Sequence, residues 1–222
     1  MTPLLATPPD RLPLHVSDVT LPGLVLLNCG HALALALVTP AAGVGVWRRP
    51  ALAFQAALAA CPADALPDGR VTIAATDDAI ATGLHQLLSH SRLPMAVSAG
   101  IAADAAALAR HFARASAARR LQIRLDAVNG PACRRFHQDH VRARLLCSYR
   151  GPGTELAPAN VDLNAGRAAF SLDTAWVAVL RGHRHPLGAG PLLHRSPQTA
   201  QGAPAETRLL LAIDADPDDG RS

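Results

Sequence analysis

The chain has 222 residues, half of them hydrophobic, and a formal net charge of +4 at pH 7. This length fits one large domain with a sizeable core. All 21 residues of the Lys and Arg class are Arg, which excludes Schiff-base chemistry through Lys and a phosphate-binding loop built on Lys. The Arg residues are scattered and aromatic residues make up only 3% of the chain, so we expect no nucleic-acid partner.

The cysteines and the most apolar run indicate a cytoplasmic protein without a membrane partner. The four Cys residues include no Cys-x-x-Cys pair, which argues against a zinc ribbon or a redox motif and favours free thiols. The run from Leu24 to Val38 is interrupted by Asn28 and His31 and is too short to cross a bilayer. No basic segment typical of a signal peptide follows Met1.

The chain divides into three parts by composition. Residues 1–45 are predicted to form an irregular, Pro-rich N-terminal arm with the strands that lead into the domain. Residues 46–216 are predicted to form one α+β domain. The acidic end that starts at Asp214 is expected to fray, and residues 217–222 are expected to be a disordered tail.

The order of the predicted elements indicates the fold class. Apolar spacing predicts helices packed outside a sheet, over residues 50–60, 77–90 and 103–119. Alternation predicts strands over residues 121–128, 141–149, 174–181, 191–195 and 208–214. Helices followed by antiparallel strands with Gly and Pro turns indicate an α+β fold with a sandwich or barrel core.

A His-x-Asp pair supplies the candidate site. His137 and Asp139 are two positions apart on a predicted strand, so their side chains point to the same side. We expect this strand to continue to Tyr149, with Tyr149 on the side of Asp139 and Arg144 on the other side. His194 follows 57 positions after His137 (194 − 137). Two imidazoles and one carboxylate are the ligands of non-haem Fe(II) oxygenases, although a polar strand end explains the pair alone.

Several specific segments resemble a known family. They are the stretch from Cys133 to Thr154 with its Gly-Pro-Gly-Thr turn, the segment His194-Arg195-Ser196-Pro197, and the final strand Arg208–Asp214. Together with Trp47-Arg48-Arg49-Pro50, they resemble the bacterial domain-of-unknown-function 1826 (DUF1826) family. That family has no assigned activity, but its members are often found beside zinc-responsive genes and metallochaperone-like GTPases. The resemblance therefore implies metal homeostasis and association with a metallochaperone.

The order of the site residues is similar to that in Fe(II)/2-oxoglutarate-dependent oxygenases. This similarity implies a double-stranded β-helix core of the jelly-roll or cupin type, with the metal site in residues 133–214, and Fe(II) and 2-oxoglutarate as cofactors. Those enzymes commonly hold the distal carboxylate of 2-oxoglutarate with a basic residue on the last strand. Arg208, 14 positions after His194 (208 − 194), fits that role. Arg144 and Arg195 are alternatives, and Tyr149 is a further candidate through its hydroxyl.

Two other functions fit the same residues. The first is a zinc-binding protein of metal homeostasis without oxygenase activity, with His137, Asp139 and His194 as ligands, or alternatively His183, His185 and His194. The second is an interaction module whose site has lost its chemistry. The sequence does not indicate a substrate, and it contains no Gly-x-Ser-x-Gly motif of a serine hydrolase.

Overall fold

The computed structural model describes residues 21–130, 133, 135–159, 170–198 and 207–216. The helices are α1 (Ala34–Val38), α2 (Gln55–Ala59), α3 (Asp77–Ser89) and α4 (Met95–Ser116), with short 3₁₀ turns η2 (Gly30–Leu33) and η3 (Ala63–Ala65). The strands are β1 (Leu24–Leu27), β2 (Val44–Trp47), β3 (Gly69–Ala74), β4 (Arg120–Asn129), β5 (Ala143–Arg150), β6 (Glu155–Pro158), β7 (Phe170–Ser171), β8 (Val177–Arg181), β9 (Leu192–Arg195) and β10 (Thr207–Ala215).

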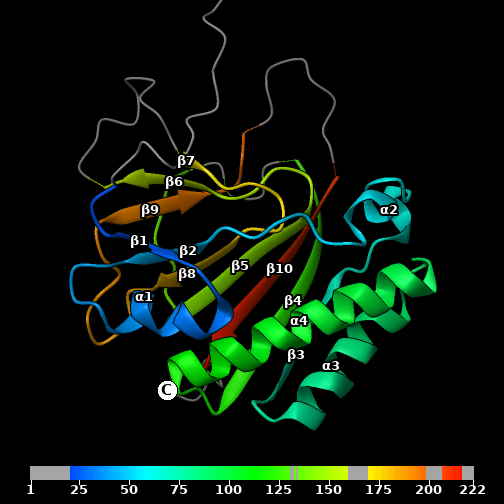
Figure 1. Ribbon diagram of the computed structural model, residues 1–222, viewed down its shortest axis with the longest axis horizontal. Helices are drawn as coiled ribbons and strands as arrows, with labels where there is room; N and C mark the ends of the chain where they lie inside the picture. Colours follow the sequence, from blue (N-terminus) through cyan, green and yellow to red (C-terminus); the bar gives the residue numbers. More distant parts are fainter. Residues whose placement is uncertain (1–20, 131–132, 134, 160–169, 199–206, 217–222) are drawn as a thin grey trace, which may run out of the picture.

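The strands form two sheets whose connections define the fold (Figure 1). The large sheet has the order β1-β2-β8-β5-β10-β4-β3, and the small sheet has the order β7-β6-β9. From β4 onward the chain passes repeatedly between the sheets, because β4, β5, β8 and β10 lie in the large one and β6, β7 and β9 in the small one. The pairings among these strands are antiparallel. This arrangement is a double-stranded β-helix, and it confirms the predicted α+β fold.

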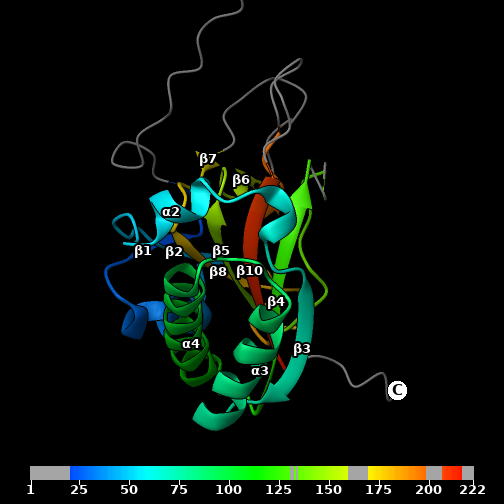
Figure 2. The same cartoon turned by 90° about the vertical axis from the view of Figure 1, so that its right-hand side faces the viewer.

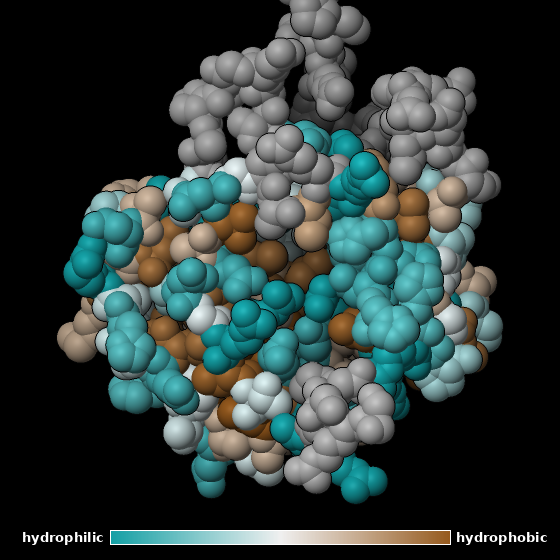
Figure 3. All heavy atoms as spheres, turned by 180° about the vertical axis from the view of Figure 1, so that it is seen from behind, coloured by the Kyte–Doolittle hydropathy of each residue, from teal (hydrophilic) through white to brown (hydrophobic). Residues whose placement is uncertain are grey.

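The large sheet has an apolar layer on each face. On β5, Leu145 belongs to the cluster that packs under the helices, whereas Leu146 belongs to the cluster between the two sheets. On β10, Leu211 and Ala212 divide in the same way, as side-chain alternation along a strand requires. Helices α3 and α4 cover one face of the large sheet (Figure 2). The opposite side of the molecule carries many polar side chains around smaller apolar areas (Figure 3).

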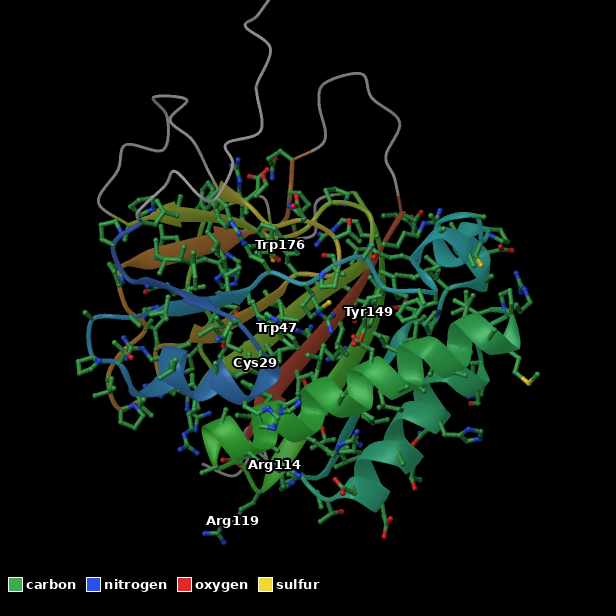
Figure 4. All side chains as sticks on the ribbon, in the orientation of Figure 1. Cys29, Trp47, Arg114, Arg119, Tyr149 and Trp176 are labelled. Carbon is green, nitrogen blue, oxygen red and sulfur yellow. The ribbon has the colours of Figure 1, made fainter. Side chains whose placement is uncertain are left out.

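A buried polar network fixes α4 to the sheet. The Arg49 guanidinium donates to both carboxylate oxygens of Asp104, at 2.7 and 3.1 Å, and to the carbonyl oxygen of Ala175 at 2.7 Å. The hydroxyl of Tyr149 donates to Asp104 Oδ2 at 2.8 Å, and Figure 4 shows Tyr149 on the helix side of β5. Burial raises the pKa of the neighbouring Cys147 thiol to about 12, so this Cys is an unreactive packing residue at neutral pH.

The structure corrects several predicted boundaries. Helix α4 begins at Met95, eight residues before the predicted start, because Pro94 opens the helix and the Ala-rich stretch gives no clear start signal. The predicted helix over residues 50–60 is reduced to α2. Strand β2 crosses the expected boundary at residue 45 and pairs with β8 in the large sheet. Residues 1–20 and the tail 217–222 lie outside the described residues.

Asp214 and Asp216 make defined contacts, contrary to the expected fraying from Asp214. Asp214 lies on β10 and is only 4% exposed. Asp216 accepts hydrogen bonds from the backbone N–H groups of Arg119 and Arg120. In the described part of the chain, no helix combines the length and apolar character needed to span a bilayer.

Candidate metal centre

Residues 135–139, here called the ligand segment, include the candidate ligands His137 and Asp139. This segment lies at the edge of the small sheet, beside β9. His137 and His194 form an isolated antiparallel bridge in which each backbone N–H donates to the carbonyl oxygen of the other, at 3.0 and 2.9 Å. Leu192, two residues before His194, belongs to the apolar cluster between the sheets. His194 therefore points from β9 toward the large sheet, and its side chain is 8% exposed. His137 and Asp139 both lie beside the imidazole of His194.

One candidate ligand atom from each of three side chains lies in the same small region. The candidate donor atoms of His137, Asp139 and His194 all lie within 4.8 Å of one another. His194 Nε2 lies 3.0 Å from Asp139 Oδ2, and His137 Nε2 lies 3.5 Å from Asp139 Oδ1. The side chain of His137 is 35% exposed and that of Asp139 is 13% exposed, so the group is open on one side and buried on the other.

The hydrogen bonding of this group leaves atoms that could bind a cation. Asp139 Oδ2 is buried and has no hydrogen-bond partner within the described residues. His137 Nδ1 lies 3.0 Å from the carbonyl oxygen of Arg135. Since that oxygen can only accept, Nδ1 carries a proton, and in the neutral imidazole Nε2 then has the free lone pair. Two imidazoles and one carboxylate oxygen then suit Fe(II) bound on one face, and they also suit zinc.

Asp139 is ionised at neutral pH. Burial alone raises its pKa, but the contact with His194 and the positive charge of Arg144 outweigh burial and hold the pKa at about 2. A carboxylate is the protonation state that binds a cation.

Arg144 lies against Asp139, which corrects the predicted strand. The chain turns at residues 140–142 and crosses into the large sheet before β5 begins. This break resets the alternation, so Arg144 faces the small sheet and Tyr149 faces the helices. Arg144 Nη1 lies 2.7 Å from Asp139 Oδ1, and Nε and Nη2 donate to Asp214 at 2.5 and 2.8 Å. Its donors are therefore taken by carboxylates of the chain itself.

Two further predicted cofactor residues do not join the group. Tyr149 donates to Asp104 on the helix side of the sheet, so the prediction that its hydroxyl reaches a cofactor is wrong. Arg195 follows His194 on β9 and points to the other face of the small sheet. There it donates to Glu155 Oε2 at 2.7 Å and lies over the ring of Phe136, 4.2 Å from the ring centroid.

Arg208 is buried in the space between the sheets. It alternates on β10 with Leu209, which packs under the helices, and it is 4% exposed. Its Nε donates to the carbonyl oxygen of Pro152 at 2.8 Å and its Nη2 donates to Ser148 Oγ at 3.1 Å. Among the described residues it makes no ion pair with a carboxylate. Burial lowers its pKa to about 10, so it stays charged at neutral pH and suits an anionic ligand.

A sequence model of the DUF1826 family, described as a protein of unknown function, matches residues 31–214. The chain belongs to this family. The match confirms the resemblance found in the sequence, and it covers the ligand segment, β9 and β10 of this DUF1826 chain. No curated protein shows significant sequence similarity to it.

Solved structures with some likeness to the DUF1826 chain include two dioxygenases for auxin oxidation and a prolyl-4-hydroxylase. The Arabidopsis thaliana dioxygenase for auxin oxidation 1, in a binary complex with 2-oxoglutarate, is 14% identical over 88% of this chain and 93% of its own, with a TM-score of 0.47. The rice dioxygenase for auxin oxidation is 16% identical over 84% and 76%, with a TM-score of 0.45. A Pseudomonas putida prolyl-4-hydroxylase is 15% identical over 84% and 98%, with a TM-score of 0.43. These similarities are weak, and the fold assignment rests on the strand order of the chain itself.

The alternative His set is not assembled within the described residues of this DUF1826 protein. The ligand group defined above includes neither His183 nor His185. His185 Nδ1 instead accepts a hydrogen bond from Leu187 N, inside its own turn. The loop between β8 and β9, which contains His183 and His185, contacts the site through its backbone. His183 N donates a hydrogen bond to Asp139 O at 2.9 Å. A Cβ at Gly182 would lie 2.1 Å from the carbonyl oxygen of Val141, so this close approach requires glycine.

The low pKa of Asp139 predicts a pH-dependent contribution to stability. In the metal-free protein, the shift from 3.8 to about 2 contributes on the order of 2 kcal/mol to folding at neutral pH. Because the folded-state pKa is the lower one, this contribution is present above pH 4 and is lost as the pH falls toward 2. We expect the difference in unfolding free energy between wild type and Asp139→Asn to shrink over that window, measured by urea unfolding with a chelator present. A difference that does not change with pH would contradict the assignment; Asp64→Asn, at an exposed site, is the control.

Proposed function

We propose that this protein is a non-haem Fe(II) oxygenase that uses 2-oxoglutarate as co-substrate. The observation that carries the proposal is the convergence of His137, Asp139 and His194, with a buried carboxylate oxygen that has no hydrogen-bond partner among the described residues. The group lies between the sheets of a double-stranded β-helix. Three protein donors leave coordination positions for co-substrate and O₂, as the facial arrangement of such oxygenases requires.

The residues of the chain divide the work in this proposal. His137 Nε2, Asp139 Oδ2 and His194 Nε2 would hold the iron, which when bound supplies the redox chemistry with O₂. Arg208 would hold the distal carboxylate of 2-oxoglutarate through a charge-assisted hydrogen bond, with Ser148 Oγ orienting its guanidinium. The apolar cluster between the sheets, which includes Leu146 and Leu156, keeps water away from this interior.

Metal analysis of untagged protein tests the proposal. We expect wild type prepared anaerobically to retain Fe(II), and the double variant His137→Ala, Asp139→Ala to lose it, because two of three ligands are removed. Addition of 2-oxoglutarate to the anaerobic wild-type Fe(II) protein is expected to produce a visible charge-transfer band. The double variant His183→Ala, His185→Ala removes two imidazoles near the site but outside the ligand group, so it is expected to behave as wild type.

The other outcomes separate the remaining functions. Zinc that stays bound in wild type, is lost in His137→Ala, Asp139→Ala and is not replaced by Fe(II) would favour a zinc-binding protein over the oxygenase, provided that 2-oxoglutarate causes no spectral change. Equal metal content in wild type and the His137→Ala, Asp139→Ala variant would refute the metal centre and favour an interaction module.

A further inference from the structure

A buried ion pair lies directly behind Asp139. Arg144 on β5 and Asp214 on β10 are opposite each other in the antiparallel register, and the guanidinium binds both oxygens of the Asp214 carboxylate. The Arg144 side chain is 16% exposed and that of Asp214 is 6% exposed. The remaining donor, Nη1, reaches Asp139 Oδ1 at 2.7 Å. We call Asp139, Arg144 and Asp214 the carboxylate clamp.

Stability alone does not explain the clamp. Removing two charges from water costs about as much as, or more than, their attraction returns, so well-packed apolar side chains at such positions are often equally stable or more stable. Leu146 and Ala212, the next residues on the same faces of β5 and β10, belong to the apolar cluster between the sheets. An apolar pair in place of Arg144 and Asp214 would extend that layer.

The charges of the clamp favour a cation. Arg144 and Asp139 together are neutral (+1 − 1 = 0), and a carboxylate cancelled in this way is a poor ligand. Asp214 adds a second negative charge, so the clamp carries −1 in total (+1 − 1 − 1 = −1). Asp214 also accepts two of the three hydrogen bonds or ion-pair contacts of the Arg144 guanidinium, and Asp139 makes the third. Asp139 therefore keeps Oδ1 fixed on Arg144 while the negative charge near Oδ2, the oxygen without a hydrogen bond, is retained.

We infer that Arg144 and Asp214 are positioning residues of the metal site: Arg144 selects Oδ2 of Asp139 as the ligand oxygen, and Asp214 preserves the negative charge that attracts the cation. Partners behind a ligand commonly orient it and raise its basicity. This inference rests on the metal centre of the proposed function, and it does not depend on the oxygenase reaction.

The chain provides a matched control pair. Arg142 and Asp216 lie two residues before Arg144 and two residues after Asp214, and Arg142 Nη1 lies 2.9 Å from Asp216 Oδ2. Both side chains are about one third exposed, at 36% and 34%. Within the described residues neither makes an ion pair with Asp139. The two pairs thus have the same chemistry, and only one of them touches a ligand.

Titration with Co(II) tests the inference, because its absorption spectrum reports the ligands and their geometry. We expect Asp214→Asn to bind Co(II) about 10- to 100-fold more weakly than wild type, and Arg144→Lys to change the spectrum, since an ammonium cannot reproduce the three-way contact. Asp216→Asn and Arg142→Lys are expected to match wild type in affinity and spectrum. Equal Co(II) affinity in Asp214→Asn and Asp216→Asn would overturn the inference.

A second variant keeps the test valid if Asp214→Asn fails to fold. The double change Arg144→Met, Asp214→Leu removes the two charges of the ion pair together, so it avoids the unpaired guanidinium that Asp214→Asn leaves, and we expect this variant to fold. Its Co(II) spectrum is expected to differ from wild type, because Asp139 is no longer held. A stable double variant with wild-type Co(II) affinity and spectrum would show that the clamp is purely structural and would overturn the inference.

The results also separate this inference from the proposed function. Wild type that binds Co(II) with the expected differences, but gives no reaction with 2-oxoglutarate after Fe(II) loading, would support the clamp and reject the oxygenase. Wild type that binds no Co(II) would overturn both.

Discussion

Replacing Arg208 with Ala is expected to weaken 2-oxoglutarate binding about 30-fold or more, while changing Fe(II) affinity by less than about threefold. Arg208 is 4% exposed and makes no ion pair within the described residues, so a ligand carboxylate would be its counterion. Truncating one partner of a buried, hydrogen-bonded charge pair costs roughly 2–5 kcal/mol or more, which corresponds to a factor of about 30 to several thousand. The measurement is anaerobic titration of the Fe(II) protein with 2-oxoglutarate.

Two comparisons make this result specific. Arg195→Ala removes a guanidinium of the small sheet that is already paired with Glu155, and we expect 2-oxoglutarate affinity close to wild type. Thermal unfolding provides a second measurement, because a ligand that binds the native state stabilises it. Saturating 2-oxoglutarate should raise the melting temperature of the wild-type Fe(II) protein but not that of Arg208→Ala. Equal 2-oxoglutarate affinity in wild type and Arg208→Ala would remove Arg208 from the site.

Replacing Asp104 with Ala is expected to lower the free energy of unfolding by about 3–5 kcal/mol, the usual effect of leaving a buried charge without its partner. Asp104 is the acceptor for both Arg49 and Tyr149, and the Arg49 side chain is 5% exposed. Its loss leaves a guanidinium and a hydroxyl without their acceptor between α4 and β5. Urea unfolding monitored by circular dichroism measures the change.

An exposed ion pair provides the control for this prediction. Asp64 pairs with Arg92, and their side chains are 73% and 67% exposed. Exposed pairs contribute about 0–1 kcal/mol, so Asp64→Ala should be close to neutral. A change below about 1 kcal/mol in Asp104→Ala would show that the network adds little to the attachment of α4.

Local patterns in the sequence identified most strands, because alternation and Gly-Pro turns are short-range signals. The strand predicted over residues 121–128 is β4, Arg120–Asn129, and the strand predicted over residues 208–214 is β10, Thr207–Ala215. Helix α3 was also predicted almost to its last residue. In contrast, the predicted start of α4 is wrong. Ala fits helical and strand patterns alike, so an Ala-rich stretch shows little separation of polar and apolar faces. Residue type and spacing place His137, Asp139 and His194 in one candidate group, and the family resemblance favours that group over a polar strand end.

Contacts across the sheets could not be predicted in the same way. Arg144 and Asp214 are 70 positions apart, and their pairing follows from the register of β5 and β10, which no local pattern specifies. The orientation of Tyr149 was wrong for a related reason. A turn at residues 140–142 reverses the face that each later residue of β5 presents, and one added or missing residue exchanges the faces. For Asp214 the sequence predicts a solvated end, because its partner is distant in sequence.

The segment that carries His137 and Asp139 lies outside the named strands, and an isolated bridge joins its His137 to His194. Two backbone hydrogen bonds join residue 137 to β9 and one joins Asp139 to His183, whereas β10 pairs with β4 from Thr207 to Ala215 and with β5 from Leu209 to Asp214. Local opening of such a segment does not require the rest of the sheet to unfold. A cation held by residues 137, 139 and 194 would close this opening by cross-linking two distant parts of the chain. Amide exchange and proteolytic cleavage at the segment would then report metal loading, so the filled and empty forms of the protein would differ in lifetime as well as in chemistry.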